Sequence, residues 1–444
     1  MSELKFNVEW QSTGSGALEF RETSAFLSVC AGHTVITRNE DLWSKTLRDS
    51  VLVSTYPLAI WLAASWWRLN HEPMPCQGPR LPTDWRMAHE LGAANHGYVW
   101  PHVAFASDSE VMQVWSAAPQ PAKAQSVRYL AECAVSMPLA AFQSGVDEFI
   151  GAVIRRLSAV GAGETDLAQL WALVQADRQD PAAARLRKIE AALGYDPDEC
   201  PQGLLDQALD FDRVLGGDAL AELAPLYGRF APEPSLTALD DFLGQPGLLG
   251  KPRLPRLPLK SCRAAPPWER AVAAARALHG VLGLGEGKVK DQTLHDLLGL
   301  SSSTDAAVQD TGPRLQAAVG VPEGADQIKF VLRRRHPDAR RFELSRFIAD
   351  LVQTAGTGQW LASTDLPTSR QKYQRAFAAE FLCPIGELQG FLNGDFSEAA
   401  IEDAASQYGV SERTVSSLLA NNGLIPTPFS GDSSEAGLRY RWAA

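Results

Sequence analysis

Six prolines between residues 245 and 267 limit how this chain can fold more than any other feature. Proline cannot donate a backbone hydrogen bond and its ring fixes φ, so closely spaced prolines interrupt helices and central strands. We therefore predict a linker over 245–267 without regular secondary structure, semi-rigid where the prolines cluster. The prolines are Pro246, Pro252, Pro255, Pro258, Pro266 and Pro267.

The linker is also basic, whereas the whole chain is acidic. It carries five cationic residues and no acid: Lys251, Arg253, Arg256, Lys260 and Arg263. Such a run is typical of a solvated tether or of a strap on an acidic surface, with nucleic-acid contact as the alternative. The chain has 52 acidic and 41 basic residues, for a net charge of −11. Because this field repels phosphate, the composition disfavours nucleic-acid binding as the main role.

Length and composition indicate a globular protein of several domains. A chain of 444 residues exceeds one ordinary core, so we expect about two to four domains. The hydrophobic fraction of 45% and the charged fraction of 21% exclude a mostly disordered, fibrous or multi-span membrane protein. Six widely spaced cysteines fit neither a zinc ribbon nor a disulfide framework, and no signal-peptide pattern is visible. These features predict a cytoplasmic location.

Residues 50–67 form an uncharged stretch long enough to suggest a membrane span. Pro57 and several hydroxyl side chains favour instead a buried helix that begins near Pro57, so we predict no membrane association.

Strand-like runs occur at 6–10, 25–29, 34–37, 98–107 and 110–116, and eight of the twelve tryptophans lie in the first 115 residues. Residues 1–120 are therefore predicted to be an α+β domain, with the Trp-rich helix packed on a small antiparallel sheet.

Helical spacing replaces strand patterns after residue 120. Apolar residues recur at helical intervals over 142–157, and DLAQLWALVQADR and ARLRKIEAALG show the same pattern. We predict a helical middle domain over 121–244. The fold class expected for the whole chain is α+β and mostly helical.

Two segments after the linker carry a family resemblance. RRFELSRFIADLV is followed by RQKYQRAFAAEFLCP and then by a helical pair that contains Gly-Val-Ser. In this order they resemble the ImmA/IrrE family of metallo-endopeptidases, over about residues 268–425. The resemblance implies a zincin-like α+β core over 268–384 and a helix-turn-helix-like region over 385–444. It also implies a bacterial setting in mobile elements, toxin–antitoxin pairs or phage defence.

The residues that the resemblance assigns to the zinc site cannot perform its chemistry. The two histidine positions are Arg346 and Asp350, the general-base position is Phe347, and the third ligand position is Gln371. A guanidinium has no lone pair for a metal and a phenyl ring cannot accept a proton. Arg346 and Asp350 are four residues apart and opposite in charge, so we expect them to pair in place of the metal. We predict neither a catalytic residue nor a cofactor.

The residues expected to line or adjoin the former zinc site are called the vestigial groove. They are Arg341, Arg346, Phe347, Asp350, Gln371 and Arg375. The main hypothesis is a catalytically inactive regulatory or interaction protein that binds a repressor, toxin or defence effector through this groove.

A transcriptional regulator is the second hypothesis. AIEDAASQYGVSERTVSSLLANNGLI fits a helix-turn-helix, with a cap at Ser411 and with Arg413, Thr414, Ser416 and Ser417 facing DNA from the second helix. Such a regulator is expected to be a homodimer. However, residues 385–444 hold eight acids and three arginines, which disfavours phosphate contact and favours packing or protein docking.

An N-terminal metal-dependent enzyme is the third hypothesis. It would draw on His71, His89, His96 and His102. His89-Glu90 resembles the start of HExxH, but the next histidine is seven residues away and cannot share a helical face in the required way. Histidines placed in aromatic-rich loops explain the pattern without a metal.

Overall fold

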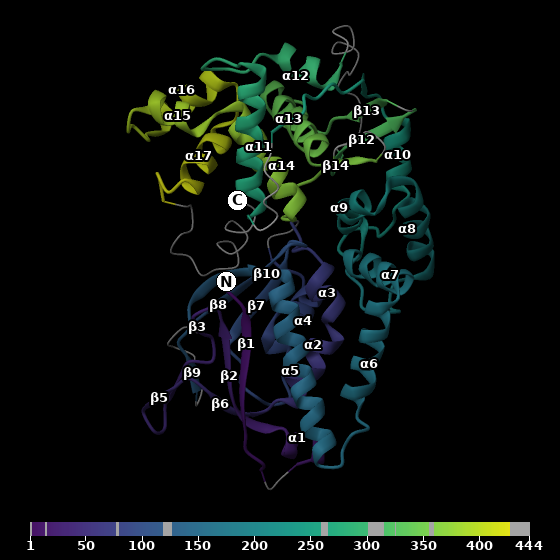
Figure 1. The fold of residues 1–444 in the computed structure, drawn as a ribbon, viewed down its shortest axis with the longest axis vertical. Coiled ribbons are helices and arrows are strands. Elements are labelled where there is room, and N and C mark those ends of the chain that lie inside the picture. The colour runs from purple at the N-terminus through teal and green to yellow at the C-terminus, as the bar shows by residue number, and fades with distance from the viewer. Residues whose placement is uncertain are drawn as a thin grey trace. The chain divides into compact units, whose positions relative to one another are not determined.

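The computed structural model describes residues 2–13, 16–76, 80–118, 127–258, 265–300, 315–324, 326–354 and 359–426 (Figure 1). The predicted boundary at residue 120, linker residues 259–264 and the C-terminal stretch 427–444 lie outside these ranges. The fold is α+β and mostly helical, as predicted. In the described part of the chain, no helix combines the length and apolar character needed to cross a membrane.

The chain divides into two compact units, which we describe separately. Unit 1 comprises Met1–Leu205 and Gly228–Phe230, and unit 2 comprises Asp206–Tyr227 and Ala231–Ala444. The helices that follow the N-terminal strands pack with those strands in unit 1, whereas the sequence suggested a separate helical domain over 121–244. A change in the period of apolar residues shows where strands give way to helices. It does not show whether those helices and strands share one hydrophobic core.

In the part of unit 1 that the structure describes, the strands form three antiparallel sheets. β1 (Leu4–Trp10) pairs along its whole length with β2 (Ser24–Ala31), on which buried positions largely alternate. The predicted runs at 6–10 and 25–29 are therefore confirmed. The first sheet also contains β3 (Thr34–Val35) and β6 (Val51–Ser54); the second contains β7 (His102–Ser107), β8 (Val111–Ala117) and β10 (Cys133–Pro138); the third contains β4 (Asn39–Asp41), β5 (Thr46–Arg48) and β9 (Val127–Tyr129).

The uncharged stretch at 50–67 enters the core of unit 1. It forms β6 and then α2 (Tyr56–Ala64), which has Pro57 in its first turn, where the missing N–H costs no helical bond. Ser65 separates α2 from α3 (Trp66–His71). Trp66 and Trp67 are buried in the same core as the strands, as predicted for the Trp-rich helix.

α5 (Leu139–Ala159) places its apolar stripe in that core as well. Phe142, Val146, Phe149 and Val153 are buried at helical spacing, which confirms the helix expected there. The other helices that begin in unit 1 are α1 (Leu18–Glu22), α4 (Thr83–His89), η1 (Leu91–Ala94), α6 (Asp166–Gln179), α7 (Pro181–Ala192) and α8 (Gln202–Leu215), and the boundary between the units falls within α8.

Residues 228–230 return to unit 1 through specific contacts. The backbone N–H of Arg229 donates to the carbonyl of Leu193 (2.8 Å), and its guanidinium pairs with Asp84 (2.8 Å). A Cβ atom on Gly228 would lie 2.4 Å from the carbonyl oxygen of Leu193, so only glycine permits this approach.

The sheet of unit 2 has the order β11-β13-β12-β14 and is antiparallel. Its strands are β11 (Leu248–Gly250), β12 (Ala318–Glu323), β13 (Gln327–Val331) and β14 (Leu361–Ser363). The strand β11 contradicts the prediction that 245–267 has no regular element. Pro246 and Pro252 flank this strand without entering it, so its backbone is free to pair with β13.

Helices cover this sheet and carry the segments that define the family resemblance. α14 (Ser369–Leu382) packs against α11 (Pro267–Leu282) and α13 (Pro337–Thr354). The remaining helices of unit 2 are α9 (Gly217–Tyr227), α10 (Ala238–Gly244), α12 (Asp291–Leu298), α15 (Ile385–Leu392), α16 (Glu398–Tyr408) and α17 (Glu412–Asn421).

The helix-turn-helix pair has the local geometry expected from its sequence. Gly409 ends α16 with φ of 62°, and the Ser411 hydroxyl accepts from the backbone N–H of Thr414 (3.2 Å) at the start of α17. Val415 and Ala405 are buried where the two helices meet.

Candidate functional site

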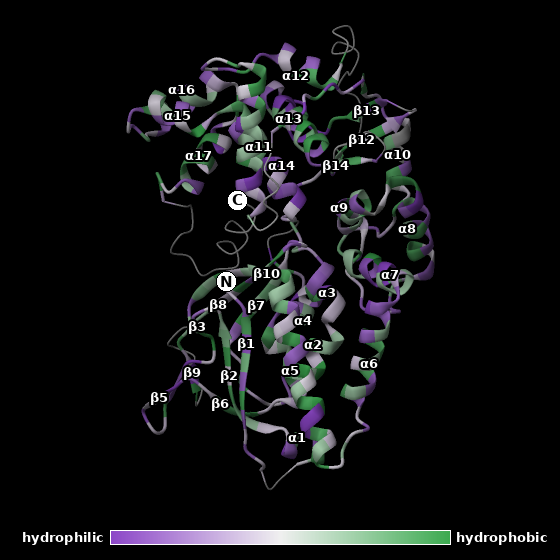
Figure 2. Ribbon diagram, in the orientation of Figure 1, coloured by the Kyte–Doolittle hydropathy of each residue, from purple (hydrophilic) through white to green (hydrophobic). Residues whose placement is uncertain are grey.

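The first half of α14 is polar in sequence and buried in the fold. Ser369, Gln371, Lys372 and Gln374 are all buried. The hydrophilic colour of these turns stands out in Figure 2, although α14 packs against α11 and α13. Burying polar groups is unfavourable unless they find partners. This helix therefore marks the part of unit 2 where packing alone does not explain the sequence.

Gln371 is the centre of a buried set of hydrogen bonds. Its Oε1 accepts from the backbone N–H of Thr364 (2.8 Å) and from a guanidinium nitrogen of Arg346, while its Nε2 donates to the carbonyl of Ala362 (2.9 Å). Thr368 begins α14 with a side-chain cap to the N–H of Gln371. The structure thus brings together Gln371 and Arg346, two positions that the family resemblance assigns to metal ligands.

Arg346 is buried and bonds to neutral acceptors. Its side chain is 3% exposed, and its other hydrogen bond runs to the carbonyl of Thr364 (2.6 Å). Among the described residues no carboxylate forms an ion pair with it, and its Nε has no partner. Burial, followed by the charges of Arg375 and Arg333, lowers the pKa of Arg346 to about 9. The guanidinium nevertheless remains charged at neutral pH.

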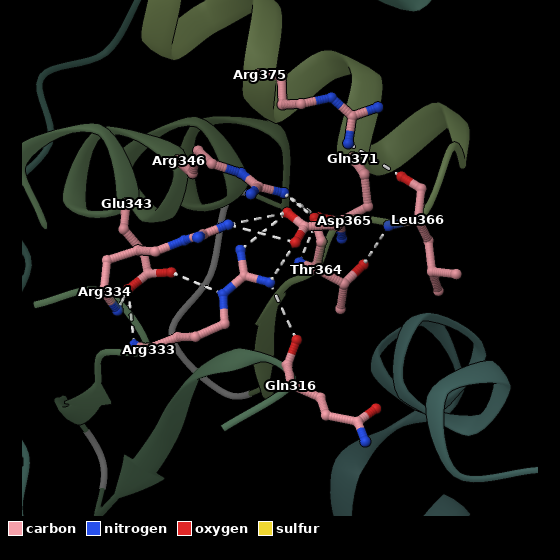
Figure 3. A network of polar contacts seen from close by, with 10 residues as sticks. All are labelled: Gln316, Arg333, Arg334, Glu343, Arg346, Thr364, Asp365, Leu366, Gln371 and Arg375. Carbon is pink, nitrogen blue, oxygen red and sulfur yellow. Dashed lines mark hydrogen bonds and ion pairs between the residues drawn. The ribbon is translucent and has the colours of Figure 1, made fainter. Parts of the chain in front are cut away.

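Asp365 lies among arginines at the more exposed edge of the same region (Figure 3). Arg333 donates to both carboxylate oxygens of Asp365, at 2.8 and 3.0 Å, and Arg334 adds longer contacts of 3.3 and 3.4 Å. Burial acts to raise the pKa of Asp365, but the charge and hydrogen bonds of Arg333 outweigh it, and the pKa lies below its usual value. Asp365 is therefore ionised at neutral pH.

A second carboxylate, Glu343, fixes the backbone of the arginines. Its Oε2 accepts from the backbone N–H groups of Arg333 (2.8 Å) and Arg334 (3.1 Å). This explains why β13 ends at Val331 and does not continue through the arginines. Arg375 of α14 donates to the carbonyl of Leu366.

We call Arg333, Arg334, Arg346 and Arg375 the arginine cluster. Figure 3 shows their guanidinium groups with the carboxylates of Glu343 and Asp365, so arginines outnumber carboxylates among the residues drawn. In a region that is mostly buried, such an excess attracts anions and opposes the binding of a cation.

Asp350 does not pair with Arg346 as expected. Its two oxygens accept from Arg370 at 2.8 and 2.6 Å, which joins α13 to α14. Burial acts to lower the pKa of Arg370, but the charge of Asp350 raises it overall. The pair does not form because Arg370, on the neighbouring helix α14, binds Asp350 instead. The spacing of four residues within α13 carries no information about a partner on another helix.

Behind this pair, Glu222 of α9 accepts from the Thr368 hydroxyl (2.7 Å), and burial raises the pKa of Glu222.

Two residues of the predicted vestigial groove lie elsewhere. The ring of Phe347 is fully buried beside Phe330, with 5.2 Å between ring centroids, so it belongs to the hydrophobic core. Arg341 donates to the carbonyls of Gly409 (3.2 Å) and Val289 (2.7 Å) and pairs with Asp291. Arg341 therefore anchors the turn between α16 and α17.

The N-terminal histidines do not gather at one site. His89 is buried in unit 1, where Nδ1 contacts the carbonyl of Phe105 (2.9 Å) and Nε2 contacts Glu72 (3.0 Å). Glu72 is also held by Arg68 (2.7 Å). Because both ring nitrogens of His89 are occupied, it is a structural residue of the core.

The other three histidines have separate surroundings. His71 stacks on Trp67, and burial, with a smaller effect of Lys188, lowers the pKa of His71 to about 3. His96 lies near Phe20, and His102 is exposed at the start of β7. In the part of the chain that the structure describes, no three His, Cys, Asp or Glu residues are placed to hold a metal ion.

The candidate DNA-reading residues carry little positive charge. Arg413 is exposed, Thr414 is engaged at the helix cap, and Ser416 and Ser417 are half-buried. From Glu398 to Asn421, Arg413 is the single basic residue against four acids.

Sequence reasoning missed Asp365 and Glu343, although both belong to the arginine cluster's surroundings. The sequence signal that could have found them is the run of three arginines at 333–335. Comparisons of this chain with protein-family models, with curated proteins and with solved structures find no match.

Proposed function

We propose that this chain is a catalytically inactive regulatory or interaction protein of the ImmA/IrrE-like type. Its role is to bind a protein partner, such as a repressor, toxin or defence effector of a bacterial mobile-element or defence locus, without cutting it. The partner binds at the vestigial groove through its exposed edge, at Arg334 and Asp365, because Arg346 and Gln371 themselves are buried. The observation that carries the proposal is the contact between Arg346 and Gln371, since it occupies two of the three positions that the resemblance assigns to metal ligands.

The donor set at this place does not fit zinc. A guanidinium offers no lone pair, and the amide oxygen of Gln371 already accepts two hydrogen bonds. The remaining carboxylate, Asp350, is bound by Arg370. Peptide hydrolysis by the family's mechanism also needs a general base, and Phe347 supplies a buried phenyl ring in its place.

The metal content of the purified chain, before and after incubation with zinc, tests the inactive state. We expect a value near zero, and no change in the thermal unfolding midpoint on adding a chelator. The His89→Ala variant is the matched control for the N-terminal alternative. Zinc close to one ion per chain would contradict the proposal, and its loss in His89→Ala would move the chemistry to unit 1.

Partner binding is tested with purified products of the genes adjacent to this one. Arg334→Glu reverses a charge at the exposed edge of the arginine cluster, where Arg334 is 47% exposed. It should weaken partner binding at least about tenfold. Arg276→Glu changes another exposed arginine of unit 2 that also pairs with a carboxylate, Glu380, and should leave binding unchanged. Equal binding by all three chains would contradict docking at this groove.

A further inference from the structure

Asp365 occupies the position that an external anion would take among the arginines. Arg333 holds its carboxylate with two parallel N–H···O contacts, the geometry that guanidinium groups use for carboxylates and phosphates. Arg334 contacts the same two oxygens. The Asp365 side chain is nevertheless 55% exposed, so the carboxylate that the arginines hold lies at the solvent boundary.

One carboxylate does not neutralise this region. Behind Asp365, the buried guanidinium of Arg346 has no ion pair with any described carboxylate, and its Nε is left without a hydrogen-bond partner. A buried donor without an acceptor is unfavourable. The second carboxylate, Glu343, directs one oxygen to two backbone N–H groups, and its other oxygen lies 3.5 Å from Arg333 Nε.

We propose that Arg333, Arg334 and Arg346 form a binding site for a phosphate group, and that the Asp365 carboxylate occupies this site in the unliganded chain. Once Asp365 is displaced, these three arginines and Glu343 leave a formal excess of two positive charges, which matches a phosphate monoester with close to two negative charges at neutral pH. A phosphate also offers three acceptor oxygens, so it can accept from Arg333 and Arg334 and still reach toward Arg346. Asp365 is the residue that such a ligand displaces.

The phosphate site rests on the proposed function in one respect, which is that the vestigial groove, to which Arg346 belongs, holds no metal. Each of the two proposals can nevertheless fail without the other. A zinc-bound chain would overturn the inactive-peptidase proposal, whereas a metal-free chain that ignores phosphate would overturn only the phosphate site.

Inorganic phosphate is the probe, titrated into the full chain by calorimetry at constant ionic strength and neutral pH. Wild type should bind weakly, because Asp365 competes. Asp365→Asn removes one negative charge while keeping the side-chain shape, and should bind phosphate at least about tenfold more tightly. Arg334→Gln, at an exposed position, should bind at least about tenfold more weakly than wild type.

Two further variants separate the site from general effects. Arg276→Gln removes an exposed, carboxylate-paired arginine of the same unit and should bind phosphate like wild type. Arg333→Gln should abolish binding, and its circular dichroism spectrum shows whether the fold survives. The proposal is overturned if Asp365→Asn gains no affinity, or if Arg276→Gln loses as much as Arg334→Gln.

The source of the phosphate is distinguished by comparing ligands on Asp365→Asn. Tighter binding of free phosphoserine than of inorganic phosphate identifies a phosphorylated side chain. Tighter binding of adenosine 5′-monophosphate identifies a nucleotide, and equal binding of all three identifies the free ion.

Discussion

Burying the guanidinium of Arg346 costs free energy that its neighbours only partly offset. Moving a guanidinium out of water into a protein interior is unfavourable by several kcal/mol in order of magnitude, and a paired carboxylate usually compensates for it. Here the hydrogen bonds of the guanidinium run to two neutral oxygens, on Thr364 and Gln371. The charges of Asp365 and Glu343 act on Arg346 from a greater distance.

Substitutions at Arg346 and Gln371 should have unequal effects on the stability of unit 2. Arg346→Met removes the buried charge at similar volume, so the free energy of unfolding should stay within about 1 kcal/mol of wild type. Gln371→Leu leaves Arg346 and the Thr364 N–H short of an acceptor and should cost about 2–3 kcal/mol. Urea unfolding followed by circular dichroism measures both. A larger loss for Arg346→Met would mean that the charge itself stabilises unit 2.

His71 should make unit 1 less stable in mild acid. The imidazole titrates near 6.5 in the unfolded chain and at about 3 in the folded one. Between these values the unfolded state binds more protons, so stability falls as the pH is lowered from about 6.5. His71→Gln should reduce this fall in the free energy of unfolding by up to about 1 kcal/mol per pH unit. The effect is smaller than for a fully buried imidazole, because the side chain is partly exposed.

Urea unfolding at several pH values, followed by tryptophan fluorescence, measures the slope. His102→Gln, at an exposed imidazole of the same unit, is the control and should leave the slope as in wild type. A His71→Gln chain with an unchanged slope would show that the acid sensitivity arises elsewhere.

At the scale of elements, local patterns predicted regular structure well where burial follows a simple period. β1, β8 and α5 form where alternation or helical spacing placed them, because each buries one face against a single core. β11 was missed because it depends on pairing with β13, which is distant in sequence.

The site was predictable only in part for the same reason. The resemblance indicated that Arg346 and Gln371 share a groove, and they do touch. The partners of Asp350 and the role of Asp365 depend on how α14 and the segment after β14 pack against α13. No periodicity in the sequence encodes that packing.

The start of α17 offers a test of an element that the sequence did predict. Ser411→Ala removes the side-chain acceptor for the Thr414 N–H and should lower the stability of unit 2 by about 1 kcal/mol. Ser406→Ala, at an exposed position within α16, should be neutral or slightly stabilising, because alanine favours helix. Chemical unfolding compares the two, and equal effects would mean that the cap contributes nothing.

At the scale of the whole molecule, the two hydrophobic cores should unfold separately. Phe142 lies in the core of unit 1 and Phe377 in that of unit 2. Phe142→Ala and Phe377→Ala should each destabilise their own unit by about 3–5 kcal/mol.

Two spectroscopic signals can distinguish the units. Nine of the twelve tryptophans lie within residues 1–205, so fluorescence reports mainly on unit 1, whereas circular dichroism reports on helices of both. Phe142→Ala should shift the fluorescence transition to lower urea concentration. Phe377→Ala should shift mainly the part of the circular dichroism transition that does not coincide with the change in fluorescence. One transition that moves equally in both variants would show that the units unfold as a single cooperative body.

The repeated crossing of the chain between the two units limits how recombination can alter such a protein during evolution. The chain crosses from one unit to the other after residues 205, 227 and 230. A single crossover between related genes therefore cannot exchange one complete unit. A crossover between 205 and 228 leaves Gly228–Phe230 from one parent facing Leu193 from the other, and a crossover after 230 divides unit 2 between the parents. We expect the two units to be inherited together and to diversify by substitution rather than by shuffling.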